Sequence, residues 1–250
     1  MTPASGRKPG APRRRAECIV LLVRPESPEN IGLAARAMKN TGCRSLRLVG
    51  LDRLDLAAHR TAVHAGDILS SAALFPDLPS AVADLNVVFA STARKRQNFS
   101  ALTLDEAVTK ISVLRPPARI GLVFGNERTG LTSDELGLSN FRFTIPQAFR
   151  QPSYNLAAAV LITLFELFRR RNEEPAESAP PTPLPFGEQD ECLRLILRKL
   201  EDRRFLHATN ARHTSEMIRD LIGRLAITAR DRRLLLAMFS HAGPGPSRRN

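Results

Sequence analysis

Residues 30–42 read NIGLAARAMKNTG, and this stretch decides how the chain begins to fold. Its apolar side chains have the i, i+3, i+4, i+7 spacing of a helix with one buried face: Ile31, Ala34, Ala35 and Met38. Arg36 lies off that face, one turn after Gly32. Because helical side chains lean toward the helix N-terminus, we expect the Arg36 guanidinium to lie unobstructed over the glycine.

A helix N-terminus attracts anions through its free N–H groups and its dipole. The stretch therefore predicts a place where a phosphate-bearing ligand meets a fixed positive group. Taken alone, however, Arg36 fits a surface ion pair as well as it fits a ligand contact.

Outward from this helix, short β-rich runs alternate with helical patterns through the first 170 residues. The runs predict strands at 18–23, 45–49, 86–90, 120–124 and 141–145. Between and after them we expect helices at 64–74, 104–111, 133–138 and 156–170, besides the one at 30–42. Such alternation predicts an α/β fold, with a parallel sheet covered by helices on both faces.

Composition divides the chain into five parts. Residues 1–15 predict a disordered basic tail, and 16–172 hold the α/β domain. Residues 173–185 contain five prolines and predict a linker. Clean apolar stripes then predict a small helical domain over 186–243, followed by a disordered tail at 244–250.

The chain is strongly basic, with a formal charge of +12 and a pI near 11.0. This charge favours a polyanionic partner, RNA or DNA, over one small acidic substrate. Ten arginines on the C-terminal helices fit either an RNA-binding face or an ordinary solvated face. With no tryptophan and one tyrosine, base stacking is a minor contribution, and contact through phosphates and shape is the better expectation.

The apolar runs are too short to span a bilayer, and no apolar leader opens the chain. The three cysteines, Cys18, Cys43 and Cys192, lie far apart and lack the spacing of metal ligands. We therefore expect a cytoplasmic protein with no membrane contact and no metal.

The common nucleotide motifs are missing: no G-x-G-x-x-G opens the first helix, and no Walker A sequence is present. Three other segments can carry chemistry. Ser91-Thr92-Ala93-Arg94 ends the third predicted strand, where ligands bind in open α/β sheets, although the hydroxyls also fit a simple turn cap.

The second segment is 122–131, LVFGNERTGL. Gly125 would permit close approach of the backbone to a flat ligand, and Glu127 would fix the loop or a partner residue. The third runs from Ile145 through a polar bend to Ser153-Tyr154-Asn155. Ser153 or Asn155 can cap the following apolar helix, but a Ser-x-Asn pair is more than capping requires.

Together these stretches resemble the SpoU/TrmH branch of the SPOUT methyltransferases, which transfer methyl groups from S-adenosyl-L-methionine to ribose 2′-hydroxyls of RNA. The three signature stretches of that branch are similar to residues 30–42, 123–131 and 145–159, in the same order. The spacing, residues 91–94 and the helical extension look most like TrmJ-type enzymes, which methylate nucleotide 32, C or U, in the tRNA anticodon loop.

The resemblance implies a C-terminal trefoil knot and a homodimer that completes the site. It also implies residue roles. Cofactor-binding positions are Ser91, Thr92, Ala93, Gly125, Glu127, Gly130, Ile145, Ser153, Tyr154 and Asn155. Catalytic positions are Asn30, Arg36, Ser153 and Asn155. Tyr154 stands where leucine is common and Asn126 where arginine is frequent, and we expect both differences to be tolerated.

Because a guanidinium stays protonated in proteins, Arg36 is expected to clamp a phosphate and orient the 2′-hydroxyl rather than act as a base. Base catalysis by Arg36 is the competing version. The alternatives to a tRNA methyltransferase are an rRNA 2′-O-methyltransferase of the same fold and a catalytically silent RNA-binding protein. The intact glycine, serine and asparagine positions argue against the silent one.

Overall fold

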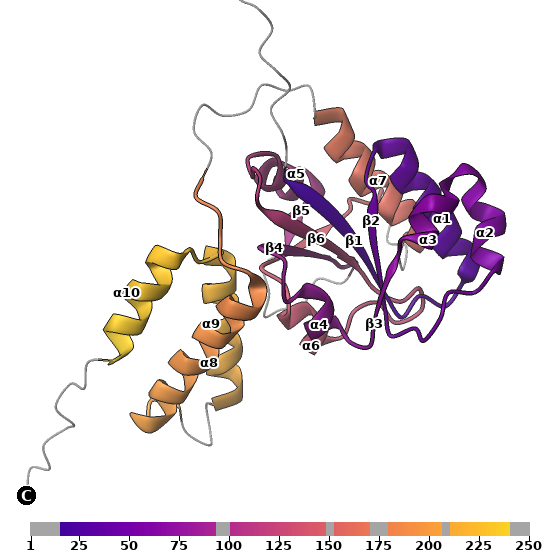
Figure 1. The fold of residues 1–250 in the computed structure, drawn as a ribbon. Helices are drawn as coiled ribbons and strands as arrows, with labels where there is room; N and C mark the ends of the chain where they lie inside the picture. The colour runs from indigo at the N-terminus through magenta and orange to yellow at the C-terminus, as the bar shows by residue number, and fades with distance from the viewer. Residues whose placement is uncertain (1–15, 94–100, 149–152, 171–179, 207–210, 241–250) are drawn as a thin grey trace, which may run out of the picture.

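The computed structural model describes residues 16–93, 101–148, 153–170, 180–206 and 211–240. Its centre is a seven-stranded sheet in the order β3-β2-β1-β6-β4-β7-β5, and every strand pairing is parallel (Figure 1). The strands are β1 Glu17–Val23, β2 Ser45–Val49, β3 Ala73–Phe75, β4 Val87–Ser91, β5 Leu102–Thr103, β6 Arg119–Phe124 and β7 Phe141–Thr144. The parallel α/β prediction is confirmed.

All five predicted strands are present within a residue or so of their expected bounds. The two that the sequence did not indicate, β3 and β5, lie at the two edges of the sheet. Strands of three and two residues are too short to show a period. The helix expected at 64–74 is wrong: a short helical turn and α3, Gly66–Ser70, take its first part, and the chain then enters β3.

Helices cover both faces of the sheet. One face packs against α1 Pro28–Thr41, α2 Ala57–Ala62, α3, α5 Leu104–Ser112 and α7 Leu156–Arg169. The other packs against α4 Leu78–Val82 and α6 Ser133–Gly137, and receives Phe186 from the C-terminal helices. The alternation within β1 divides its side chains accordingly: Val20 and Leu22 face the first core, whereas Ile19 and Leu21 face the second.

The C-terminal helices are α8 Phe186–Asp202, α9 Ala211–Leu225 and α10 Ala229–Ser240. They enclose a small core of their own, made of Cys192, Leu193, Ile196, Ile222 and Ile227. They dock beside the sheet, at the amino ends of β4 and β7 (Figure 1).

Buried polar contacts hold this docking. The Asn140 amide donates to Gln189 Oε1 and to the backbone carbonyl of Gly223, each at 3.0 Å. Arg142 at the start of β7 forms a buried ion pair with Asp220 of α9. Burial lowers the pKa of Arg142, and the Asp220 carboxylate opposes that effect. The helical extension is therefore fixed to the sheet by partnered groups that water does not reach.

No helix in the described parts of the chain is long and apolar enough to cross a membrane. Several sequence predictions lie outside the described residues: the tail 1–15, Arg94, part of the bend before Ser153, most of the linker, and the tail 244–250.

Candidate active site

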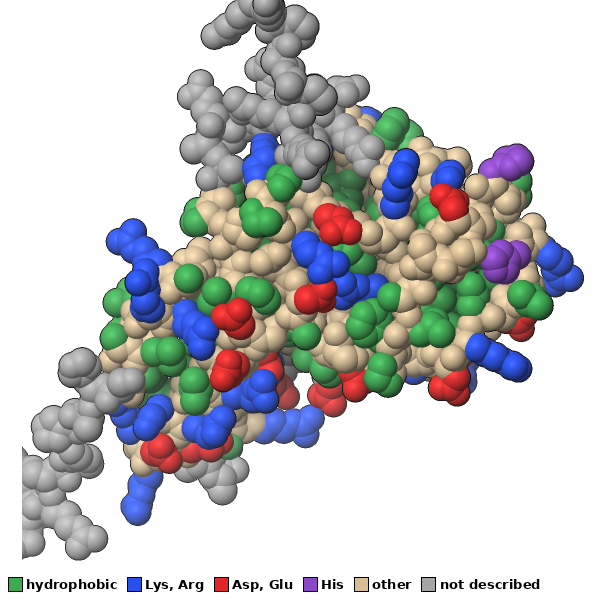
Figure 2. Space-filling model, in the orientation of Figure 1, with side chains coloured by type: hydrophobic (Ala, Val, Ile, Leu, Met, Phe, Trp, Pro, Cys, Tyr) green, Lys and Arg blue, Asp and Glu red, His purple; other side chains and the backbone are tan. Residues whose placement is uncertain are grey.

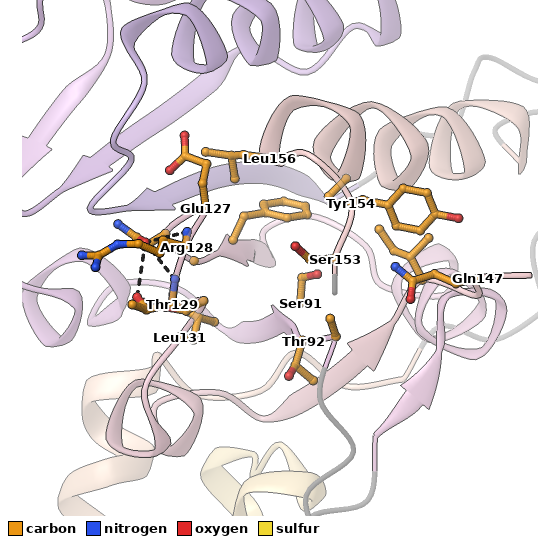
Figure 3. Close-up of a pocket in the computed structure, with 17 residues that line it drawn as sticks. Ser91, Thr92, Glu127, Arg128, Thr129, Leu131, Gln147, Ser153, Tyr154 and Leu156 are labelled. Atoms are coloured by element: carbon orange, nitrogen blue, oxygen red, sulfur yellow. Dashed lines mark hydrogen bonds between the residues drawn. The ribbon is translucent and has the colours of Figure 1, made fainter. Parts of the chain in front are cut away.

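A polar pocket with a cavity volume of about 170 Å³ opens where β4, β6 and β7 end (Figure 3). Carboxyl ends of parallel strands are the usual ligand site of open α/β sheets. Of the ten residues expected to bind cofactor, nine line this pocket: Ser91, Thr92, Ala93, Gly125, Glu127, Gly130, Ile145, Ser153 and Tyr154. Asn155 lies just outside the lining. Three segments far apart in sequence thus meet at one place.

Asn126 organises the loop that forms one wall of the pocket. Its side-chain oxygen accepts hydrogen bonds from the backbone N–H groups of Arg128 and Thr129, at 2.9 and 3.0 Å. Its amide donates to the carbonyl of Arg24 and to the carboxylate of Glu26. Asn126 is buried. Its hydrogen bonds close the loop locally and connect it to residues 24–26, which follow β1. Asparagine at this position therefore has a structural role of its own.

Gly125 is needed for a reason different from the expected one. A Cβ at this position would lie 2.5 Å from the backbone of both Gly130 and Leu131. The group that lies closest to Gly125 in this structure is therefore the returning end of its own loop, and Gly125 also lines the pocket. Gly130 closes the same turn with a positive φ of 67°, a conformation that suits glycine.

Glu127 joins this loop to α1. Its carboxylate accepts from the backbone N–H groups of Glu26 and Ser27, at 2.9 and 3.3 Å, and from the side-chain amide of Asn30 at 2.9 Å. Partial burial raises the pKa of Glu127, but these hydrogen bonds outweigh it and hold the pKa below the ordinary value. Glu127 is therefore an ionised positioning group that fixes the start of α1.

Asn30 links Glu127 to the third segment. While its amide donates to Glu127, its Oδ1 accepts a hydrogen bond of 2.9 Å from the amide of Asn155. The Asn155 oxygen in turn caps α7 by accepting from the N–H groups of Ala157 and Ala158. Asn155 is thus both the helix cap and a bridge. The row Asn155–Asn30–Glu127, called the amide relay below, joins one residue from each sequence segment.

The expected anion site at the start of α1 needs correction. The helix begins at Pro28, two residues before Asn30, and Ser27 is its N-cap. The Ser27 hydroxyl accepts from the N–H of Asn30, and the Glu127 carboxylate accepts from Glu26 and Ser27. The negative group at this end of α1 is therefore the carboxylate of Glu127 rather than the phosphate of a ligand.

The expected space above Gly32 is also filled. A Cβ on Gly32 would lie 2.1 Å from the Ala58 carbonyl oxygen and 2.1 Å from the Thr61 hydroxyl oxygen. Gly32 allows α2 to pack closely on α1, and it gives no room for Arg36. The Arg36 side chain is exposed, and it forms no hydrogen bond or ion pair within the described residues. Among the residues that the structure describes, Arg36 therefore has no ion pair.

Figure 3 shows the wall opposite the loop. Ser91 is the last residue of β4 and Thr92 follows it, whereas Ser153 and Tyr154 precede α7. The Tyr154 hydroxyl donates to the Pro146 carbonyl at 2.8 Å, which ties the entry of α7 to the end of β7.

Sequence reasoning did not assign several pocket residues: Phe124, Arg128, Thr129, Leu131, Gln147, Leu156 and Ala159. Four of them are apolar residues that lie within the stretches 123–131 and 145–159 but received no role of their own: Phe124, Leu131, Leu156 and Ala159. Arg128 and Thr129 lay between two glycines in a loop already marked as chemical, and their position there was an available signal.

The basic surface of the C-terminal helices is partly neutralised. Ion pairs occupy Arg194, Arg212, Arg219, Arg224 and Arg232. In the described residues Arg198, Arg204, Arg230 and Arg233 have no such partner. Figure 2 shows blue and red side chains interspersed over this region. An RNA-binding face on the C-terminal helices would therefore depend mainly on the arginines without an ion pair: Arg198, Arg204, Arg230 and Arg233.

Comparison with known proteins places these observations in a family. Residues 17–165 match the model of the SpoU rRNA methylase family. TrmJ of Pseudomonas aeruginosa, a tRNA (cytidine/uridine/adenosine-2′-O-)-methyltransferase, is 34% identical over 88% of this chain and 91% of its own length. LasT of Escherichia coli, an uncharacterized tRNA/rRNA methyltransferase, is 34% identical over 59% of this chain and 66% of its own length.

Solved structures of methyltransferases also superpose on this chain. TrmJ from Z. mobilis ZM4 superposes with a TM-score of 0.75 at 30% identity, covering 89% of this chain and 97% of that one. The SpoU methyltransferase AviRb from Streptomyces viridochromogenes, in complex with the cofactor AdoMet, gives 0.50 at 25% identity over 65% of this chain and 64% of that one. The chain therefore belongs to the SpoU methylase family, as a methyltransferase related over most of its length to TrmJ-type tRNA 2′-O-methyltransferases.

Proposed function

We propose that this protein transfers a methyl group from S-adenosyl-L-methionine to a ribose 2′-hydroxyl of tRNA. The observation that carries the proposal is the amide relay Asn155–Asn30–Glu127, which holds the three family segments together at the rim of one pocket. A catalytically silent RNA-binding protein would not need to keep all three segments connected around a pocket.

The pocket suits the proposed cofactor. Its lining combines the apolar side chains of Phe124, Leu131 and Leu156 with the hydroxyl-bearing residues Ser91, Thr92 and Ser153. This combination fits a molecule with a flat base, a ribose and a charged amino-acid end. Bound there, the cofactor would supply an activated methyl group. The residues of the chain would hold it in place and exclude water.

Arg36 is proposed to act on the RNA. With no partner among the described residues, its guanidinium is available to grip the phosphate next to the target ribose. Gripping the phosphate would align the 2′-oxygen with the methyl group, an effect of orientation rather than of base strength. The proton of the hydroxyl would pass to that phosphate or to water.

A homodimer is part of the proposal. Arg36 lies six residues beyond Asn30, roughly 9 Å along the α1 axis, and it does not line the pocket. The outer side of α7 exposes Leu161 at 43% and Phe165 at 50%, and the adjacent α1 exposes Leu33 at 41%. Pairing two copies through this apolar face would cover it and would let Arg36 of one copy serve the pocket of the other.

Three finer expectations come from the resemblance. Position 32 of the anticodon loop is the proposed target, and the cytoplasm, where tRNA is found, is the proposed location. A trefoil knot is proposed for the C-terminal part of the α/β domain. In its support, β7 pairs beside β4, and α7 then returns across the sheet to pack on α1.

The proposal is tested by incubating the protein with labelled S-adenosyl-L-methionine and either tRNA or rRNA, followed by mapping of 2′-O-methylated nucleotides. We expect label in tRNA, at position 32. Label in rRNA alone would contradict the choice of substrate, and label in neither RNA would contradict the proposed enzyme.

A further inference from the structure

Arg128 is the single Lys, Arg or His among the described residues that line the pocket. It lies in the loop between Gly125 and Gly130, directly after Glu127. Its side chain is 79% exposed. The neighbouring carboxylate of Glu127 is already engaged by three hydrogen bonds, so it does not neutralise Arg128 by direct contact.

The guanidinium of Arg128 is oriented but largely unused. Its Nε donates to Glu26 Oε1 at 3.4 Å, and Glu26 is itself held by the amide of Asn126. Neither terminal nitrogen of Arg128 has a partner within the described residues. An ion pair this long and this exposed contributes little on its own. The contact with Glu26 orients the guanidinium so that its two terminal nitrogens point outward from the loop.

Figure 3 shows the direction of that donor. The Arg128 side chain extends away from Ser91 and Ser153, which stand on the opposite wall of the pocket. An oxyanion on Arg128 would therefore arrive from outside the pocket, beside its mouth. This direction favours a group on the RNA over the carboxylate of a cofactor held inside.

We propose that Arg128 binds an RNA phosphodiester next to the target ribose, through its two terminal nitrogens. The planar fork of arginine matches two phosphate oxygens, and a lysine would offer only a point charge. This inference rests on the proposed function, because it names a second phosphate contact for the same reaction. Arg36 on α1 and Arg128 in the loop from Gly125 to Gly130 would then both bind the RNA backbone.

The test compares Arg128→Ala and Arg128→Lys with the unmodified protein, in steady-state methylation of a tRNA transcript at several salt concentrations. We expect Arg128→Ala to raise the KM for tRNA about tenfold, as expected for loss of a charged hydrogen-bonded contact. The slope of log affinity against log salt should fall by about 0.7 to 0.9. Arg128→Lys should recover the salt slope but not the whole KM.

Arg44→Ala is the matched control, because Arg44 is also exposed but lies at the opposite end of the sheet, just before β2. It should leave the KM for tRNA unchanged. An unchanged KM and salt slope in Arg128→Ala would overturn the inference. So would a raised dissociation constant for S-adenosyl-L-methionine with tRNA binding intact, since the fork would then serve the cofactor carboxylate. If the unmodified protein methylates no RNA, the proposed function itself fails, which is a distinguishable result.

Discussion

The side-chain amide of Asn155 donates a hydrogen bond of 2.9 Å to Oδ1 of Asn30, which lies 125 positions earlier in the chain. Through this contact the cap of α7 also fixes a residue of α1. Because Asn30 then donates to Glu127, the position of each segment depends on the other two. The amide relay is therefore the structural link between the loop from Gly125 to Gly130 and the helix that carries Arg36.

Replacing Asn155 separates its two roles. Asn155→Asp keeps an oxygen that caps α7, but it has no amide to donate to Asn30. We expect a loss of about 1 to 3 kcal/mol in the free energy of unfolding, because the cap is preserved but Oδ1 of the buried Asn30 loses its donor. Methylation should fall at least tenfold. Chemical unfolding and initial rates measure the two effects, and full activity in Asn155→Asp would contradict a catalytic need for the relay.

Glu127 makes a pH-dependent contribution to stability. Its native pKa lies below the ordinary value of 4.5, so its hydrogen bonds contribute fully above that pH. The contribution is lost as the pH falls through the native pKa and the carboxylate is protonated. Glu127→Gln should therefore be less stable near neutral pH, by about 1 to 3 kcal/mol, and should lose less stability on acidification. Urea unfolding at a series of pH values measures both, and parallel curves for the two proteins would count against this assignment.

Two glycines of one loop provide a matched pair. Gly125→Ala places a methyl group 2.5 Å from backbone atoms, so the loop must move. Gly130→Ala meets no atom within 4 Å and suffers only the strain of its positive φ, about 1 to 2 kcal/mol. We expect Gly125→Ala to lose more than tenfold in affinity for S-adenosyl-L-methionine by calorimetry. Gly130→Ala should lose less, and the reverse order would disprove the role given to Gly125.

The docking of the C-terminal helices depends on a buried charge pair. Asp220→Asn removes the carboxylate that pairs with Arg142, whose side chain is only 4% exposed. We expect a loss of about 3 to 5 kcal/mol in the free energy of unfolding. Glu216→Gln is the control, because its partner Arg212 is 94% exposed and such pairs contribute less than about 1 kcal/mol. Equal losses in the two variants would show that the docking does not rest on the Arg142 pair.

The sequence predicted the sheet because its central strands are buried and apolar, and it missed β3 and β5 because they are short edge strands. It also marked the segments that line the pocket, since hydroxyls and a glycine lie where β4 and β6 end, and a Ser-x-Asn pair precedes α7. It did not reveal what those residues contact. Gly125 and Gly32 are close-packed against the protein's own backbone, and no local pattern distinguishes that from space left for a ligand.

The amide relay was equally invisible in the sequence. Asn30, Glu127 and Asn155 are ordinary polar residues in their own segments, and only the tertiary fold brings them within hydrogen-bond distance. Arg128 escaped notice because a lone arginine in a loop has no periodicity. Its place at the pocket rim depends on how Asn126 pins that loop.

Methyl transfer to a ribose 2′-oxygen of tRNA can be measured with two tRNAs as substrates. They are identical except that one carries a 2′-deoxy nucleotide at position 32, and the methylated products are mapped by mass spectrometry. We expect a methyl group on the ribose of nucleotide 32 in the first tRNA and none on that nucleotide in the second. Methylation of the base at that position, or equal methylation of both tRNAs, would overturn the proposed ribose 2′-O-methylation.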